Sequence, residues 1–426
     1  MQLTSFPAAL LLAAALAGAC DQPAALVATP TDGAAGQGGA TTPRDTVTGT
    51  RWLQLATYVG RTCGVRDSGR VFCTADTNST PAPRALPARP GGAAAAISYA
   101  SSGTPCTLGD EGVIQCWVGD RWSAPFTEDH RFAQIDGGPD TGCALTAAGA
   151  PWCWWFEGTS RNPIFRFVAI GGAPPLTQIQ YGYYFACGLA RDGAAYCWTL
   201  GPVRGTAGQL GDGTLDARTT AAPVKTDVRF ASLALGSLHA CGRTAAGEVW
   251  CWGSNMGNAL GVPRDVAREG CGTGELAAAA PFSWATHWCT TPQRVETTLR
   301  FRALSAASER TCGLTDDGTA YCWGANQGLT LGVATVADGA CRLLGPTSGP
   351  TPCTARPTAV SGGLRFAVLA RDRGGYHQCA VTESGRAYCW GAVRPDGRPA
   401  LLVRLDDGSV VNATAQPVAL ADPTGG

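Results

Sequence analysis

The chain has 426 residues, a formal net charge of zero and 45% hydrophobic residues. A nucleic-acid binder would carry a basic surplus, so we expect no nucleic-acid partner. The 13 Trp residues and the hydrophobic share exclude disorder for most of the chain. The 19 cysteines are too many for a reducing cytosol and indicate an exported protein with disulfides.

The N-terminus has the features of an export signal. An apolar run from Pro7 to Ala19, too short to span a bilayer as a helix, ends directly before Cys20. The segment resembles the lipobox of bacterial lipoproteins, which implies that residues 1–19 are a signal peptide and that Cys20 is lipidated. An ordinary secretory peptide with a chance cysteine is the alternative. Residues 21–48 are rich in Ala, Gly, Thr and Pro, and we expect a flexible linker there.

These features predict a location in a bacterial cell envelope, periplasmic or at the cell surface, or otherwise secretion. Contact with a membrane is expected only through the lipid anchor, and the folded part is expected to be a monomer.

Residues 49–426 contain seven repeats, each marked by two cysteines ten positions apart. The pairs are Cys63/Cys73, Cys106/Cys116, Cys143/Cys153, Cys187/Cys197, Cys241/Cys251, Cys312/Cys322 and Cys379/Cys389. A glycine stands six residues after the first cysteine in all seven, and Trp follows the second cysteine in six. Repeats of this length indicate an array of similar supersecondary units.

The spacing within each pair predicts a disulfide-closed β-hairpin. A three-residue hairpin loop ends in a residue with positive φ, which glycine adopts without steric cost. With the shared glycine in that position, the two cysteines lie opposite each other and close enough for a disulfide. Next to them, a small residue faces an aromatic ring, as in the pairs Gly64/Phe72, Gly188/Tyr196, Gly313/Tyr321 and Ala380/Tyr388. We expect the ring to lie over the small residue.

Each hairpin is flanked by two further predicted strands. A large apolar residue recurs eleven positions before the first cysteine, as in Trp52, Leu176, Phe230 and Phe301, and predicts a preceding strand. A Pro-led apolar segment, such as Pro223-Val224 or Pro417-Val418, follows and suits an outer edge. We name these strands A to D in chain order, with D outermost.

Both faces of the hairpin are apolar. Cys312, Leu314 and Cys322 share one face, whereas Tyr321 and Trp323 lie on the other. Each hairpin must therefore be covered on both sides. A propeller of radially arranged four-stranded blades provides that cover.

The stretches GSLHACGRTAAGEVWCWGSNMGNALG and GTAGQLGDGT resemble the repeats of the regulator-of-chromosome-condensation family. The resemblance covers about residues 49 to 420 and implies an all-β, seven-bladed propeller with one disulfide-bonded hairpin per blade. Repeats one to three lack the GQLG-type loop. The family includes a nuclear exchange factor, a plant photoreceptor and a bacterial enzyme inhibitor, so it shares a scaffold and no single chemistry.

Four more cysteines lie in two long inserts between strands C and D of repeats five and six, about Gly261 to Thr290 and Gly332 to Ala355. We expect the disulfides Cys271–Cys289 and Cys341–Cys353, which leave Cys20 alone for the lipid. Cross-pairing between the inserts is the alternative. The inserts should project side by side from one face of the propeller. They are either recognition elements or surface insertions without a function, which loops accept at little cost in stability.

The same face carries the A–B loops, which supply the predicted binding residues. Tyr and Arg are enriched at interface hot spots. The candidates are Tyr58, Arg61, Tyr183, Tyr184, His239, Arg310, Arg373 and Tyr376. His239 and His377 each stand two residues before a hairpin cysteine, and we expect hydrogen bonds to a neighbouring blade in preference to a metal.

The sequence predicts a protein or other macromolecule as the partner, with no cofactor, no metal site and no catalytic residue. Zinc-binding cysteine pairs stand closer together than ten positions, and no phosphate-binding loop or nucleophile elbow occurs. One alternative is a hydrolase or lyase that uses carboxylates at the mouth of the channel. The other is a structural component of an envelope assembly.

Overall fold

The computed structural model describes residues 51–58, 61–74, 83–90, 92–99, 104–118, 121–123, 130–137, 140–159, 162–201, 206–263, 268–273, 287–336, 340–341, 351–372, 376–392, 403–404, 410–411 and 414–420. All of them belong to one compact unit, Val47–Gly426. The predictions for the signal peptide, Cys20 and the linker lie outside these residues. No helix among the described residues is long and apolar enough to cross a membrane.

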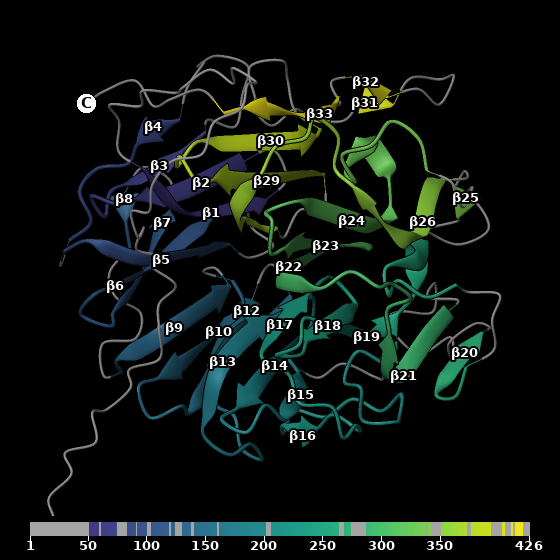
Figure 1. Cartoon of the computed structure of the whole chain (residues 1–426). Helices are drawn as coiled ribbons and strands as arrows, with labels where there is room; N and C mark the ends of the chain where they lie inside the picture. Colours follow the sequence, from purple (N-terminus) through teal and green to yellow (C-terminus); the bar gives the residue numbers. More distant parts are fainter. Residues whose placement is uncertain are drawn as a thin grey trace, which may run out of the picture. The chain divides into compact units, whose positions relative to one another are not determined.

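Seven antiparallel sheets follow one another in chain order as the blades of a β-propeller (Figure 1). Blades one to three contain β1 (Trp52–Tyr58), β2 (Arg61–Arg66), β3 (Val71–Cys73) and β4 (Arg84–Ala85); β5 (Ala94–Tyr99), β6 (Pro105–Gly109), β7 (Ile114–Val118) and β8 (Arg121–Trp122); and β9 (Phe132–Gly137), β10 (Gly142–Thr146), β11 (Pro151–Thr159) and β12 (Asn162–Ala169). Blades four and five contain β13 (Leu176–Tyr181), β14 (Phe185–Ala190), β15 (Ala195–Thr199) and β16 (Ala222–Pro223); and β17 (Ser232–Leu235), β18 (His239–Arg243), β19 (Val249–Ser254), β20 (Cys271–Thr273) and β21 (His287–Arg294).

Blades six and seven contain β22 (Phe301–Ala307), β23 (Arg310–Thr315), β24 (Ala320–Ala325), β25 (Ala340–Cys341) and β26 (Thr351–Ala359); and β27 (Phe366–Leu369), β29 (His377–Thr382), β30 (Ala387–Gly391) and β33 (Thr414–Ala419). The remaining elements are the strands β28 (Arg371–Asp372), β31 (Val403–Arg404) and β32 (Val410–Val411), and the 3-10 turns η1 (Met256–Asn258) and η2 (Gln327–Leu329). The predicted all-β, seven-bladed fold is confirmed.

The hairpin register is the predicted one. The two cysteines of every repeat are direct cross-strand partners, as Cys187 and Cys197 are in blade four. The turn glycines have positive φ, for example 80° at Gly193 and 79° at Gly318.

All nine predicted disulfides are present, seven in the hairpins and two in the inserts. They are Cys63–Cys73, Cys106–Cys116, Cys143–Cys153, Cys187–Cys197, Cys241–Cys251, Cys312–Cys322, Cys379–Cys389, Cys271–Cys289 and Cys341–Cys353. Each insert is thus closed on itself, and the alternative of cross-pairing between the inserts is wrong.

Blade two departs from the predicted form of strand D. Its hairpin is formed as expected, and Cys106 and Cys116 are 0% and 1% exposed, so this disulfide is an interior link that lies outside any binding surface. The Cys116 N–H donates to Ser123 Oγ over 3.1 Å, and the Ser123 N–H donates to the Cys116 carbonyl oxygen over 2.8 Å. The chain therefore turns back at once, with Val118 opposite Arg121. The prediction of a Pro-led edge strand after Cys116 is wrong, because β8 contains no proline.

The glycine beside the cysteine also packs against strand A, a contact that the sequence did not predict. Gly313 is paired with Tyr321 as expected. A methyl group on Gly313 would nevertheless meet Phe301 Cδ1 at 2.5 Å, and one on Gly242 would meet Phe230 Cδ1 at 2.4 Å. The recurrent large residue of strand A therefore fills the space that the glycine leaves.

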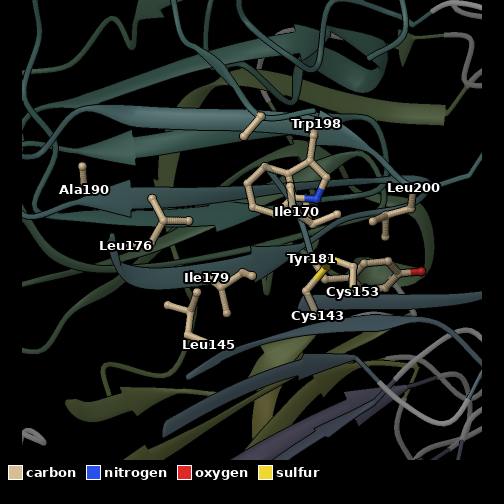
Figure 2. Packing of buried hydrophobic residues seen from close by; sticks show 12 residues of the cluster. Cys143, Leu145, Cys153, Ile170, Leu176, Ile179, Tyr181, Ala190, Trp198 and Leu200 are labelled. Atoms are coloured by element: carbon tan, nitrogen blue, oxygen red, sulfur yellow. A yellow bond between two sulfur atoms is a disulfide. The ribbon is translucent and has the colours of Figure 1, made fainter. Parts of the chain in front are cut away.

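The core lies between the blades. The cysteine face of one blade packs against the aromatic face of the next, as the disulfide Cys241–Cys251 does against Phe301 and Trp323. Figure 2 shows the corresponding cluster between blades three and four, where Cys143 and Cys153 pack with residues of the next blade. The prediction that both faces of each hairpin are covered is confirmed.

Strand D is not outermost in blades five and six, contrary to the prediction. In blade five, β20 pairs with β21 beyond it, with Cys271 opposite Cys289. In blade six, β25 pairs in the same way with β26. Each insert thus adds a fifth strand to the outer edge of its blade, because an edge strand offers unpaired backbone groups. Residues 274–286 and 342–350 lie outside the described part.

The first and last blades lie side by side (Figure 1). Among the described residues, each of these two blades takes its four hairpin and flanking strands from its own repeat. Blade seven also contributes β28, which pairs in parallel with β1. The ring is joined there by packing and hydrogen bonds between whole blades.

Candidate functional site

The A–B loops of blades four, five and six are connected through their backbones. The Tyr183 N–H donates to the Ser237 carbonyl oxygen over 3.1 Å, and the Ser237 N–H donates to the Ser308 carbonyl oxygen over 3.3 Å. Loops that would otherwise move separately are thereby held in one row across three blades. This row is the best-defined part of the predicted binding face.

Two exposed tyrosines stand at one end of this row. Tyr183 is 43% exposed and Tyr184 is 41% exposed. Their ring centroids lie 4.2 Å apart with the rings tilted by 60°. Tyr184 has φ +63°, which a bulky residue rarely adopts. Backbone strain of this kind is often found at functional sites.

The other predicted site residues are placed differently. Tyr376, at the A–B loop of blade seven, is 39% exposed, and Arg61 is half-buried. The side chain of Tyr58 and all of Arg373 lie outside the described residues. Tyr183 and Tyr184 are thus brought together, whereas Tyr376 belongs to a separate blade.

His239 and Arg310 are 1% and 2% exposed, so the prediction that they contribute to the binding surface is corrected. The Arg310 guanidinium forms an ion pair with Asp372 of blade seven. It also donates from Nη2 to the His377 carbonyl oxygen over 3.0 Å. Arg310 therefore joins blades six and seven.

The two histidines of the His-x-Cys motifs hydrogen-bond to the next blade, as predicted. His239 Nε2 lies 3.0 Å from Thr311 Oγ1. His377 Nε2 lies 3.0 Å from Thr62 Oγ1. Burial lowers the pKa of both rings to about 4. Both are therefore neutral at ordinary pH and serve as links between blades.

Two buried carboxylates, Asp136 and Asp372, come from blade three and from β28. Asp136 is buried, accepts hydrogen bonds from the Ser98 hydroxyl and the Tyr181 N–H, and lies 3.7 Å from Arg371 Nη1. The Arg371 side chain thus links β28 to blade three, far away in the sequence. The carboxylates of Asp136 and Asp372 are each paired with an arginine.

A small hollow opens between blades five and six beside the row of loops. Its lining consists of Ser237, Leu238, His239, Ser254, Met256, Ser308 and Glu309. The Glu309 side chain is half-buried. Burial raises the pKa of its carboxyl above the ordinary value, and the nearby charge of Arg310 partly offsets this. The sequence analysis missed Glu309, because no linear motif marks a carboxyl that neighbouring blades surround.

Within the part of the chain that the structure describes, no three His, Cys, Asp or Glu side chains gather in a group that would hold a metal ion.

Comparison with known proteins identifies the repeat. Residues 230–256 and 301–327 match the family model described as "Regulator of chromosome condensation (RCC1) repeat". These stretches comprise strands A to C of blades five and six.

The mitochondrial RCC1 domain-containing protein RUG3 of Arabidopsis thaliana is 28% identical over 215 residues, which are 49% of this chain and 40% of the relative. The ultraviolet-B receptor UVR8 of the same plant is 27% identical over 200 residues, 46% of this chain and 36% of the receptor. The matches therefore span well under half of the length of either relative.

Among solved structures, yeast RCC1 (Prp20), crystallised with Kap60 bound, superposes with a TM-score of 0.52 at 18% identity. The match covers 89% of this chain and 76% of that one. At this identity the likeness shows the fold.

Proposed function

We propose that this chain, a seven-bladed propeller of the regulator-of-chromosome-condensation repeat family, is an exported scaffold that binds a protein or other macromolecule. Binding uses the face that carries the A–B loops and the two disulfide-closed inserts. The observation that carries the proposal is the exposed pair Tyr183 and Tyr184, held on a loop with a strained backbone.

The geometry of this face supports binding. Tyrosines bury a large area with little loss of side-chain freedom and are frequent at hot spots. The backbone bonds from Tyr183 to Ser237 and from Ser237 to Ser308 hold the loops in place before a partner arrives. A preorganised surface loses less entropy on binding. The inserts, which extend blades five and six by the strands β20 and β25, are proposed to frame the same face.

The relatives support a binding role in general terms. Yeast RCC1 (Prp20) was crystallised with Kap60 bound to it, and UVR8 is a receptor. Neither protein identifies the partner of this chain, because members of a fold share a scaffold more often than a ligand.

Export is part of the proposal. Nine disulfides suit an oxidising compartment. They use 18 of the 19 cysteines and leave Cys20 for lipidation in a bacterial envelope. Replacing Cys20 by Ala should release the mature protein from the membrane fraction of the cells that make it. Equal retention of both forms would contradict the anchor.

Site-specific photo-cross-linking tests the binding face. We would place p-benzoylphenylalanine at Tyr183 or Tyr376 and, as controls, at Arg191 or Glu383, exposed positions in the B–C turns of blades four and seven. The partner should cross-link from the two tyrosine positions and not from the control positions, since B–C turns emerge on the opposite face. Cross-links of equal yield from both sets would overturn the proposed face.

A further inference from the structure

The hollow beside Ser237 has the size and lining of a site for one small charged group. It has room for about one water-sized group. Three serines line it, Ser237, Ser254 and Ser308, together with Glu309. The side chains of serine and glutamate carry oxygen atoms that accept hydrogen bonds.

The Glu309 carboxyl has no cation close enough for an ion pair among the described residues. Salt bridges to arginine involve other acidic groups, such as Asp372, which pairs with Arg310. Loss of water contact raises the pKa of the Glu309 carboxyl. A cation that enters the hollow would favour the charged form of this half-buried carboxyl over the protonated form.

The nearby charge of Arg310 offsets the effect of burial on the Glu309 carboxyl only in part. His239 lines the hollow, but burial lowers the pKa of its ring to about 4, so the ring is neutral at ordinary pH. Arg310 is buried, and its guanidinium is held by Asp372 and by the His377 carbonyl oxygen. Among the residues that line the hollow, Glu309 is the one acidic group, and none carries an ammonium.

We infer that this hollow binds a primary ammonium group, the lysine side chain of a polypeptide partner. An ammonium is compact and donates three hydrogen bonds, which match one carboxylate and the serine oxygens. A guanidinium is a larger planar fork and does not fit a water-sized space. This inference rests on the proposed function, because it names the group that the partner presents to the same face.

The tyrosine pair lies on the loop next to the hollow. The Tyr183 N–H is bonded to the Ser237 carbonyl oxygen, so the loop with both rings adjoins the lining of the hollow. Aromatic faces attract cations and cover the methylene groups of a lysine stem. A lysine that approaches over these rings would place its ammonium toward Glu309.

The test uses the mature, disulfide-intact chain and blocked tripeptides as probes. Binding of acetyl-Gly-Lys-Gly-amide, its Arg counterpart and its Nε-acetyl-lysine counterpart would be measured by calorimetry or by NMR titration. The lysine peptide should bind about tenfold more tightly than the other two, since only it carries a compact cation. Glu309→Gln should weaken lysine binding about tenfold. Glu383→Gln, which removes the same charge from a B–C turn, should leave it unchanged.

Equal affinity for the three peptides, or an unchanged affinity in Glu309→Gln, would overturn the inference and leave the hollow as a water site. Methylammonium binding as tightly as the lysine peptide would overturn the assignment to a polypeptide. If the partner still cross-links from Tyr183 in Glu309→Gln and the protein shows no selectivity for the lysine peptide, this inference is overturned and the proposed function stands. If the protein selects the lysine peptide but no partner cross-links from Tyr183 or Tyr376, the proposed function is overturned and the ammonium site stands.

Discussion

The glycine in each hairpin turn is used in two ways. It adopts a positive φ, as at Gly318, and its carbonyl oxygen accepts a hydrogen bond from the first residues of strand A in the next blade. Such bonds run from Phe366 to Gly318 and from Phe230 to Gly193 over 2.8 Å. The sequence predicted the turn. It did not predict the second use, because the contact joins residues that only the closed ring brings together.

The glycine beside the first cysteine offers a test of packing. Gly313→Ala would place a methyl group 2.5 Å from Phe301 Cδ1. Overpacking of this kind should lower the free energy of unfolding by about 1–3 kcal/mol. Gly171→Ala is the control, because a Cβ there meets nothing within 4 Å, and it should change stability by less than about 1 kcal/mol. Urea unfolding of both variants provides the comparison, and equal losses would contradict the assigned role of Phe301.

Acid should destabilise the propeller through His239 and His377. The pKa of each ring is about 4 when folded and near its ordinary 6.5 when unfolded. Between these values the unfolded chain binds more protons, so stability is complete above about pH 6.5 and is lost as the pH falls toward 4. From pH 7 to pH 4.5 the wild type should lose roughly 2–3 kcal/mol more per histidine than the variant His239→Gln/His377→Gln. Parallel pH slopes in urea unfolding would contradict this.

The predicted site residues differ in how well their positions could be inferred from the sequence. The histidine contacts were predicted, and a signal for their partners was present but unused: Thr precedes the first cysteine only in repeats one and six, the repeats that follow the two His-x-Cys blades. Arg310 was assigned to the surface because its loop lies on the binding face. Its burial depends on Asp372 of another blade, and residue type alone does not indicate such a pair.

At the scale of elements, the Trp after the second cysteine is coupled to the loop of the preceding blade. Trp252 Nε1 donates to the Gln209 carbonyl oxygen, and Trp323 Nε1 donates to the Ala259 carbonyl oxygen, both over 3.0 Å. Repeats one to three lack the GQLG-type loop. Trp198, which follows repeat three, accordingly has a buried Nε1 with no partner among the described residues.

This difference predicts unequal effects of one substitution. Trp252→Phe and Trp198→Phe remove a similar part of a buried ring, but only the first also leaves the Gln209 carbonyl oxygen without its donor. Trp252→Phe should therefore destabilise the protein by about 1–2 kcal/mol more than Trp198→Phe. Denaturant unfolding under non-reducing conditions measures both. A larger loss for Trp198→Phe would indicate that the loop bond contributes nothing.

The strands themselves were largely predictable, since cysteine spacing, turn glycine and apolar periodicity each specify local structure. Strand D was the exception: it was wrongly expected to be outermost in blades five and six and to begin with proline after Cys116 in blade two. The added strands β20 and β25 carry no strong strand pattern of their own, and they form because the edge strands β21 and β26 offer a partner. Pairing of this kind depends on tertiary context.

At the scale of the whole molecule, the seam between blades seven and one is, among the described blades, the only one that the chain does not cross directly. Elsewhere the chain passes from one blade to the next and keeps them close. At this seam, Trp52 and Leu55 pack against Cys379 and Cys389, and the Trp52 N–H donates to the Gly385 carbonyl oxygen over 3.4 Å, the longest bond of its series. We therefore expect the ring to open first here.

Two equivalent substitutions separate seam opening from simple loss of a contact. His239→Ala and His377→Ala each remove one histidine–threonine hydrogen bond between neighbouring blades, and each should lower stability by about 1–2 kcal/mol. Only His377→Ala acts where no chain connection holds the two blades together. Hydrogen exchange in β1 and β29 should therefore become at least about tenfold faster in His377→Ala, because local opening exposes these strands without unfolding the rest. In His239→Ala, exchange in β18 and β22 should rise by less. Equal acceleration at both seams would mean that the ring is uniformly closed and that the chain connection adds nothing to its integrity.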